Sequence, residues 1–370
     1  IFHRNTHGAF APGAFYIDGQ ASGAAQNSSH RISQMYVGGG VIVVGILFIF
    51  APRHRPSDGQ AKGLAGTRIC RHCPTTFLEV NLLRFVSFRI DERDSFGVVK
   101  DDGGIIDLAP RLADRGIHSL CHALAAGGLG DAAAAALGDP ADFAEADIEF
   151  LPVIPGPSKI ICVGLNFESH RLETGKPKAE YPTLFVRYAN TQVGHRQAVV
   201  KPVESDKFDY EGELAVVIGR EGRRIPQASA LEFVAGYSCY QDASVRDWQR
   251  HSPQFTPGKN FPDTGGFGPW LVTSDEVPPW DQMTLETRVN GTALQKGRLD
   301  DLTYGVADLI AYISKFTVLI PGDVIITGTP AGVGFARKPP IYLRNGDIVE
   351  VEIKGVGTLV NPVVAETLDG

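Results

Sequence analysis

The stretch FDYEGELAVVIGR, residues 208–220, contains the pattern on which the predicted fold depends. Asp209, Glu211 and Glu213 are spaced two apart, and the apolar run 214–218 follows directly. Side chains alternate between the two faces of a strand, so we expect the three carboxylates to share one face of a strand that then enters a core. Like charges this close repel each other, so the cluster requires an explanation.

A bound divalent cation would explain why carboxylates gather where a strand enters the interior. Oxygen ligands without His or Cys in the motif select Mg or Mn, with Ca as a further possibility, over Zn. The alternative is an exposed edge strand whose acids form salt bridges on its solvated face. Val217 and Gly219 share the face of the acids and favour its burial. We therefore expect Glu211 and Glu213, rather than Asp209, to be ligands.

The composition of the 370-residue chain is typical of a globular protein, with 43% hydrophobic and 21% charged residues. The net charge of −7 argues against a nucleic-acid-binding protein, whose binding surface would be basic. Five cysteines give no disulfide framework, which favours a reducing compartment, and we expect a cytoplasmic protein. The 42 Gly and 24 Pro favour a turn-rich, mostly β architecture.

Residues 1–80 differ in texture from the rest, and we expect them to be an extension that is disordered or not part of the working fold. Their apolar stretch at 41–51 is shorter than the roughly 20 residues that span a bilayer, so we expect no membrane partner. A signal-like segment is the alternative for this stretch. The CRHC pair at 70–73 has no second pair at zinc spacing, and we interpret it as incidental.

Residues 81–150 are predicted to form a small N-terminal strand-helix domain. Apolar and polar residues alternate on both sides of DDGG at 101–104, which predicts a hairpin. The Ala-rich segment 112–147 predicts helices, and the Pro- and Gly-rich end of IEFLPVIPGPSK predicts a linker. Residues 151–370 would then form a separate catalytic domain.

The segment KIICVGLNFESHRLET predicts a buried strand over 160–163, followed by a short helix that Asn166 caps. His170 and Glu173 lie one turn apart on that helix. A carboxylate at this spacing can orient an imidazole and raise its basicity, as an acid–base pair requires. The alternative is an ordinary surface pair, although the position directly after a core strand favours an active-site loop.

Three later segments contain further candidate site residues. FVAGYSCYQDASVRDWQRH predicts a strand that ends at Asp242, then a helix that carries Arg246 and Gln249. GKNFPDTGGFGPW contains Lys259 on a glycine-rich loop. VLIPGDVIITGTPAGVG predicts a strand that leads into Thr329 and a glycine-rich turn.

Six motifs taken together resemble the fumarylacetoacetate hydrolase superfamily over about residues 159–370. They are VGLNFESHRLE, PTLF, DYEGELAVVIG, GYSCYQDASVRDWQ, GKNF and PGDVIITGTPAGVG. The resemblance implies an α+β, mostly β fold, in which a mixed β-sandwich roll forms the catalytic domain. It also implies a Mg or Mn ion and a homodimer. The implied metal ligands are Glu211, Glu213 and Asp242. The implied catalytic residues are His170 and Glu173, which activate water, and Lys259, which stabilises enolate charge. The implied substrate-binding residues are Arg246, Gln249 and Thr329.

The chain departs from the family pattern at Phe167 and Ser169, so we assign no fourth carboxylate ligand from that loop. Arg171 and Arg187 are further positive residues near the motifs. They are candidates for binding a second substrate carboxylate, with solvated surface arginines as the alternative.

We expect a divalent-metal-dependent hydrolase that cleaves a C–C bond in a 2,4-dioxo acid, such as an acylpyruvate or a fumarylacetoacetate-like acid. A decarboxylase or enol isomerase of 2-oxo or 2-hydroxydienoic acids, in aromatic-compound catabolism, is the alternative on the same scaffold. Cleavage next to a carbonyl leaves an enolate, so either reaction needs fixed positive charge where the enolate forms. A metal-stabilised binding protein without turnover is a third possibility, against which the set of His170, Glu173 and Lys259 argues.

Overall fold

The structure is a computed structural model that describes residues 83–368, apart from 128 and 137. The predicted extension, with its apolar stretch and its CRHC pair, lies outside the described residues. The described residues all belong to one compact unit. None of the helices in the described part of the chain is long and apolar enough to cross a membrane.

The first described segment is an antiparallel meander with short helices beside it. Its strands are β1 (Arg84–Ile90), β2 (Arg93–Val99), β3 (Gly104–Asp107) and β4 (Phe143–Ala144). Asp91 and Glu92 join β1 to β2 with φ angles of 47° and 62°, as the favoured two-residue hairpin turn requires. Its helices are α1 (Leu108–Arg111), α2 (Leu120–Ala125) and α3 (Leu129–Ala136). The predicted DDGG hairpin is confirmed, because β2 pairs with β3 across it.

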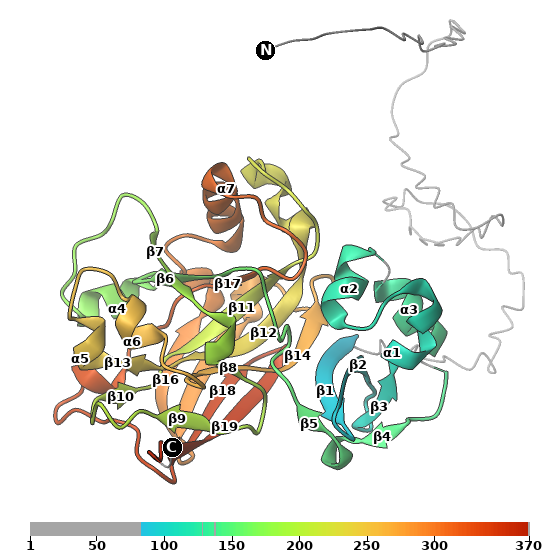
Figure 1. The fold of residues 1–370 in the computed structure, drawn as a ribbon. Coiled ribbons are helices and arrows are strands. Elements are labelled where there is room, and N and C mark those ends of the chain that lie inside the picture. The colour runs from blue at the N-terminus through green and yellow to red at the C-terminus, as the bar shows by residue number, and fades with distance from the viewer. Residues whose placement is uncertain (1–82, 128, 137, 369–370) are drawn as a thin grey trace, which may run out of the picture. The chain divides into compact units, whose positions relative to one another are not determined.

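The meander continues into one large sheet through β1, which pairs with β14 (Figure 1). From β1 onward the strand order is β14, β12, β11, β17, β6 and β7, and only β17 and β6 pair in parallel within this path. These strands are β14 (Gly265–Thr273), β12 (Val234–Asp242), β11 (Gly212–Ile218), β17 (Val324–Ile326), β6 (Ile160–Gly164) and β7 (Thr183–Arg187).

A second, five-stranded sheet packs against the first. Its order is β16 (Thr292–Arg298), β15 (Thr284–Val289), β18 (Ile348–Ile353), β19 (Gly357–Ala365) and β9 (Val199–Lys201). The strands β11, β12 and β14 of the first sheet contact β15, β18 and β19 of the second. Helix α7 (Val306–Phe316) buries one face against the core that lies between them.

Strand β11 is buried on both faces, and its alternating side chains enter two different cores. Val217 packs in a core with Phe85 of the meander. Val216 packs in another core with Leu285 and Val351 of the second sheet. A strand with two buried faces reads as a continuous apolar run, which explains LAVVI at 214–218. The predicted mixed, mostly β sandwich is confirmed.

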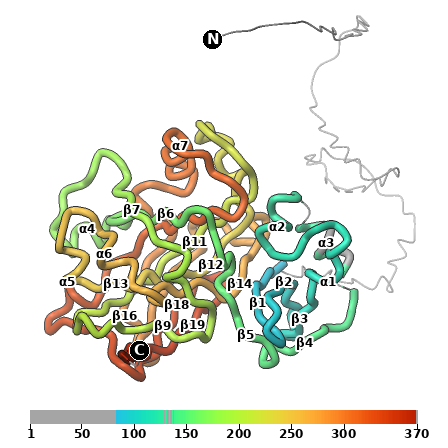
Figure 2. Tube along the Cα trace, viewed as in Figure 1, coloured from blue at the N-terminus to red at the C-terminus, as the bar shows by residue number. Residues whose placement is uncertain are grey.

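Short elements complete the described structure, and most of them lie near one end of β6 and β11. They are β5 (Glu149–Phe150), β8 (Gln192–Val193), β10 (Phe208–Asp209), β13 (Ser244–Val245), α4 (Glu168–Glu173), α5 (Arg246–Gln249) and α6 (Thr256–Lys259). Helices α5 and α6 contact each other, and α6 contacts β7. The trace in Figure 2 brings α4 into the same region.

His195 is a buried histidine that is held neutral by its surroundings. Its Nδ1 accepts a hydrogen bond from the N–H of Val360 at 3.1 Å, and its ring meets Phe150 edge to face at 4.8 Å. Burial, assisted by the neighbouring Arg196, lowers the pKa of His195 to about 4. A protonated ring would place one N–H against another, so the fold requires the neutral form.

Candidate active site

Three carboxylates converge where β11 begins and β12 ends. Gly212 of β11 pairs with Gln241 of β12, and this register places Glu211, Glu213 and Asp242 side by side. Each offers a carboxylate oxygen that lies within 4.8 Å of the others, and the three residues are 5%, 3% and 0% exposed. The predicted ligands therefore share one buried centre.

Gly212 allows the two glutamates to take these positions. A Cβ at Gly212 would lie 2.0 Å from Oγ1 of Thr287 and 3.2 Å from Cγ1 of Val351, both in the second sheet. Real Cβ atoms essentially never make a contact as short as 2.0 Å, so with any other residue here either the Thr287 side chain or β11 would have to shift. The backbone between Glu211 and Glu213 is thus fixed by the close approach of the two sheets.

Buried cations pair with two of the three carboxylates. The ammonium Nζ of Lys259 lies 2.6 Å from Oε2 of Glu211 and 2.5 Å from Oδ2 of Asp242. Arg246 binds the other oxygen of Glu211 at 2.7 Å, and Arg187 binds the other oxygen of Asp242 at 2.6 Å. Glu213 has no ion-pair partner among the described residues. It accepts a hydrogen bond from the N–H of Gly328.

The electrostatics of the cluster differ between the two glutamates. Burial raises the pKa of Glu213 well above its usual value, and the nearby charges of Asp242 and Glu211 raise it further. Burial acts in the same direction on Glu211, but Arg246 and Lys259 overcome it and hold the pKa of Glu211 below its usual value. Without a metal, the surroundings of Glu213 therefore favour its protonated form, and a bound cation would displace that proton.

This donor set fits a hard divalent cation. All of the donors are carboxylate oxygens, which Mg, Mn and Ca prefer, and a cation beside Glu213 would balance its charge. The residues that would hold it are Glu211, Glu213 and Asp242. Lys259 now contacts one oxygen of Glu211 and one of Asp242, so binding through those two oxygens requires the ammonium to move.

Asp209 does not belong to the carboxylate cluster. Tyr210 and Glu211 separate β10 from β11, so β10 pairs with β13 while β11 pairs with β12. The expectation that three carboxylates share one strand face is therefore wrong. Asp209 instead accepts hydrogen bonds from Arg246 Nε at 2.8 Å and from the N–H groups of Gly334 and Phe335 at 2.8 and 3.0 Å. It braces the arginine that binds Glu211.

His170 and Glu173 form the pair that their spacing predicts. Nδ1 of His170 lies 3.3 Å from Oε2 of Glu173, and His170 is 6% exposed. The other carboxylate oxygen, Oε1, accepts the N–H of Gly332 at 3.0 Å. When Nδ1 carries the proton towards Glu173, the lone pair of the imidazole is on Nε2. No hydrogen bond engages Nε2 within residues 83–368 as described.

The predicted cap of this helix is wrong. Phe167 occupies the cap position of α4, without a side-chain hydrogen bond. Asn166 instead donates to the carbonyls of Thr327 and Tyr304, at 2.8 and 3.0 Å, and accepts the N–H of Tyr304 at 2.9 Å. Asn166 thus joins the loop before α4 to the loop that holds Gly328 and Thr329.

The predicted site residues surround one pocket of about 320 Å³. His170, Lys259 and Thr329 line it, together with Glu211, Glu213, Arg246 and Gln249. The remaining two lie directly behind this lining, since Asp242 contacts Lys259 and Glu173 contacts His170. The pocket also contains lining residues that sequence reasoning missed, which are Lys176, Phe185, Arg250, Phe255 and Phe335. Of these, Phe185 lay in the motif PTLF and Arg250 in the segment FVAGYSCYQDASVRDWQRH, but neither was given a role from the sequence.

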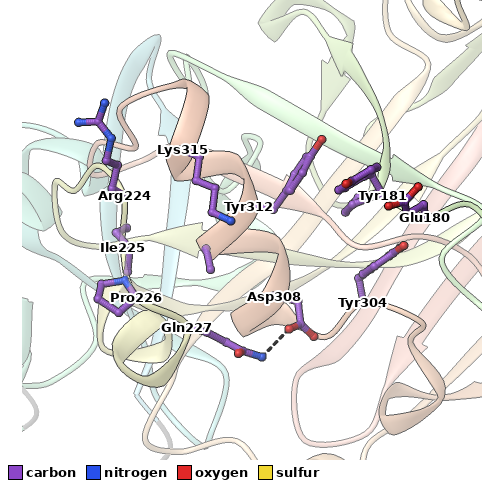
Figure 3. Close-up of a pocket in the computed structure, with 12 residues that line it drawn as sticks. Glu180, Tyr181, Arg224, Ile225, Pro226, Gln227, Tyr304, Asp308, Tyr312 and Lys315 are labelled. Carbon is purple, nitrogen blue, oxygen red and sulfur yellow. Dashed lines mark hydrogen bonds between the residues drawn. The ribbon is translucent and has the colours of Figure 1, made fainter.

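A second hollow, of about 760 Å³, lies between α7, the segment 224–227 and the segment 180–182 (Figure 3). It shares no lining residue with the carboxylate pocket. Figure 3 shows Tyr312 and Lys315 on α7, with Asp308 bonded to Gln227. Its acidic side chains do not converge with others in the part of the chain that the structure describes. The smaller pocket is therefore the candidate active site.

Comparisons with known proteins show the family to which the chain belongs. Residues 159–364 match the family described as Fumarylacetoacetate (FAA) hydrolase C-terminal. Oxaloacetate tautomerase FAHD2A, mitochondrial, from Homo sapiens is 41% identical over 220 residues, which are 59% of this chain and 70% of that protein. Among solved structures, fumarylacetoacetate hydrolase from Exiguobacterium antarcticum is similar with a TM-score of 0.68 and 35% identity, over 77% of this chain and 100% of that chain. A 2-hydroxyhepta-2,4-diene-1,7-dioate isomerase from Mycobacterium marinum has a TM-score of 0.60 and 30% identity, over 77% and 99%.

The chain belongs to the fumarylacetoacetate hydrolase family. The resemblance inferred from the motifs is thus confirmed, and the chain is an enzyme of this superfamily. The names of the similar proteins include a tautomerase, a hydrolase and an isomerase. They leave the predicted hydrolase reaction as one of several chemistries that this scaffold performs.

Proposed function

We propose that the protein is a divalent-metal-dependent enzyme that interconverts the enol and keto forms of a small 2-oxo dicarboxylic acid, with oxaloacetate as the first candidate. The observation that carries the proposal is the convergence of His170, Lys259 and the carboxylate cluster on one pocket. The similar human protein named oxaloacetate tautomerase supports this choice over the hydrolase that the sequence alone favoured.

The size and charge of the pocket support a small anionic substrate. Its volume of about 320 Å³ is near the lower end of ligand pockets. The lining includes the cations Lys259 and Arg246 at its buried end and Lys176 and Arg250 on exposed segments. Glu211 and Glu213 offset the two buried cations in this lining, so Lys176 and Arg250, together with a bound metal, would attract an anion.

The chain supplies the proton transfers. A divalent metal, when bound by Glu211, Glu213 and Asp242, would polarise the 2-oxo acid through its oxygens. In our proposal His170 takes a proton from C3 of the keto form through Nε2 and returns one to C3 in the reverse direction. Glu173 keeps the ring in the required tautomer. Lys259 provides fixed positive charge beside the position where the enolate oxygen forms. The protonated His170 then returns its proton to this oxygen, which gives the enol and restores the neutral imidazole.

Hydrolysis of a 2,4-dioxo acid is the second candidate, and the His170–Glu173 pair is the observation that favours it. The same Nε2 could take a proton from water instead of from C3, and the water would then attack the carbonyl. The similar protein from Exiguobacterium antarcticum is named a fumarylacetoacetate hydrolase. Decarboxylation would use Lys259 and the metal without the pair.

The test follows the ultraviolet absorbance of enol-oxaloacetate after it is diluted into buffer with Mg²⁺ and the full chain. We expect the absorbance to decay faster than in buffer alone, and we expect EDTA to abolish the difference. His170→Ala should lose most of this activity, whereas His122→Ala, an exposed histidine on α2, should keep it. If the absorbance decays at the rate seen in buffer alone and the chain cleaves an acylpyruvate, the tautomerase proposal is wrong and the hydrolase proposal takes its place.

A further inference from the structure

We propose that Arg250 and Lys176 bind the distal carboxylate of the substrate and so make the enzyme select dicarboxylic over monocarboxylic 2-oxo acids. This inference rests on the proposed function, because it assigns the residues that recognise the substrate of the same site. Both side chains line the pocket and belong to exposed residues. They come from two separate segments, one after α4 and one after α5.

The buried cations of the site are already engaged. Lys259 binds Glu211 and Asp242, Arg246 binds Glu211 and Asp209, and both are fully enclosed. In contrast, neither Arg250 nor Lys176 has an ion-pair partner among the described residues. Two pocket-lining cations are therefore available for a ligand carboxylate, which can accept charge-assisted hydrogen bonds from both.

Arg250 is oriented by the aromatic wall of the pocket. Its guanidinium lies over the ring of Phe335 at 5.0 Å from the ring centre, and the guanidinium of Arg246 lies over the same ring at 4.5 Å. Phe335 itself lines the pocket. An exposed arginine that stacks on an aromatic ring loses part of its conformational freedom, so it meets a ligand at a smaller entropic cost.

Contacts with Arg171 of α4 hold the backbone at Lys176. Arg171 forms an ion pair with Glu168 at 2.5 Å and donates from Nη1 to the carbonyl oxygen of Lys176 at 2.7 Å. These contacts hold the backbone at Lys176, which is one of the residues that line the pocket. Arg171 therefore acts on the segment and does not line the carboxylate pocket.

The arginines that the sequence suggested for a second substrate carboxylate are excluded by their contacts. Arg187 is 2% exposed and binds Asp242 at 2.6 Å, so it has no access to a substrate. Arg171 pairs with Glu168 as described. In our proposal, Arg250 and Lys176 take the role of binding the second substrate carboxylate, for which the sequence had suggested Arg171 and Arg187.

The test measures binding by calorimetry to the Mg²⁺-loaded full chain, with two stable ligands that differ only at the distal end. 2-Oxoglutarate has a carboxylate where 2-oxopentanoate has a methyl group. We expect Arg250→Gln and Lys176→Gln each to weaken 2-oxoglutarate binding by about 3- to 10-fold, and the double variant by about 10- to 50-fold. Binding of 2-oxopentanoate should change by less than about 2-fold. The loss of 2-oxoglutarate affinity that the variants cause should become smaller as the salt concentration is raised.

The matched control is Arg223→Gln combined with Lys354→Gln, which removes the same charge at exposed residues that do not line the pocket. It should leave both affinities unchanged. Equal weakening of both ligands by the pocket variants, or no weakening of either, would overturn the inference. Selective weakening in a chain that does not tautomerise oxaloacetate would uphold this inference and overturn the proposed reaction. If the chain tautomerises oxaloacetate but the pocket variants weaken both ligands equally, the proposed reaction is upheld and this inference is overturned.

Discussion

Replacement of Lys259 by Met should destabilise the metal-free protein at neutral pH by about 3–5 kcal/mol. Lys259 is 1% exposed, and its ammonium bridges Glu211 and Asp242 at 2.6 and 2.5 Å. Methionine keeps the length and the apolar part of the side chain but leaves two buried carboxylates without the charge between them. The stated range is the usual cost of removing one partner from a buried ion pair.

The assay measures the free energy of unfolding by urea denaturation in EDTA, for the variant and for wild type. The two values are compared on the condition that both proteins show the same slope of unfolding free energy against urea concentration. Mg²⁺ at 100 times its dissociation constant should restore about 2.7 kcal/mol, because a cation replaces the missing ammonium. Lys354→Met, at an exposed lysine, is the control and should lie within about 0.5 kcal/mol of wild type.

The dependence on pH gives an independent check of the same reasoning. In wild type, the pKa of Glu211 is held below the ordinary 4.5 by Arg246 and Lys259 in spite of its burial. A depressed carboxylate pKa stabilises the fold above the ordinary value, and this stabilisation is lost as pH falls through the folded pKa. The difference in unfolding free energy between wild type and Lys259→Met should therefore become smaller below about pH 4.5. A metal-free variant within 1 kcal/mol of wild type at pH 7 would refute the ion-pair account.

Three further outcomes follow from the structure. Glu173→Gln and His170→Ala should each lower the rate of the catalysed reaction by about 10²–10⁴-fold, with Mg²⁺ affinity measured by calorimetry little changed; retention of the full rate would mean that another group moves the proton. Because the pKa of His195 falls from 6.5 to about 4 on folding, about 3 kcal/mol of stability should be present above pH 6.5 and lost as pH drops towards 4; His195→Gln should flatten the unfolding free energy over this window. Gly212→Ala should weaken Mg²⁺ binding and lower the melting temperature, because its Cβ would meet Thr287 at 2.0 Å; unchanged metal affinity would show that the approach of the sheets does not position the ligands.

The local features of the fold could be predicted from the sequence because each depends on neighbouring residues. The apolar run at 214–218 predicted a buried strand, DDGG predicted a hairpin, and the spacing of His170 and Glu173 predicted their contact. The convergence of Asp242 on the glutamates was accessible only through the family motifs. Nothing in the local pattern gives the register that pairs Gly212 with Gln241.

The missed features depend on contacts between residues that are distant in the chain. Asp209 faces Arg246 and the segment at 334–335, which lies 125 residues further along, and Asn166 faces Thr327 across 161 residues. The local pattern placed Asp209 on the strand face of the two glutamates and Asn166 at a helix cap, and only the tertiary structure shows their actual contacts. Arg250 carried no signal, since a lone arginine after a short helix is ordinary. The homodimer implied by the family resemblance stays a prediction.

The central claim is that Glu211, Glu213 and Asp242 hold a catalytic divalent cation. A crystal structure of the full chain grown with Mn²⁺, with anomalous scattering recorded for the metal, tests it most directly. We expect one anomalous peak among these three residues, with carboxylate oxygens at about 2.0–2.6 Å and the ammonium of Lys259 moved away from the bound oxygens. A Mn²⁺-containing crystal with no peak there, and with Lys259 still between Glu211 and Asp242, would contradict the claim.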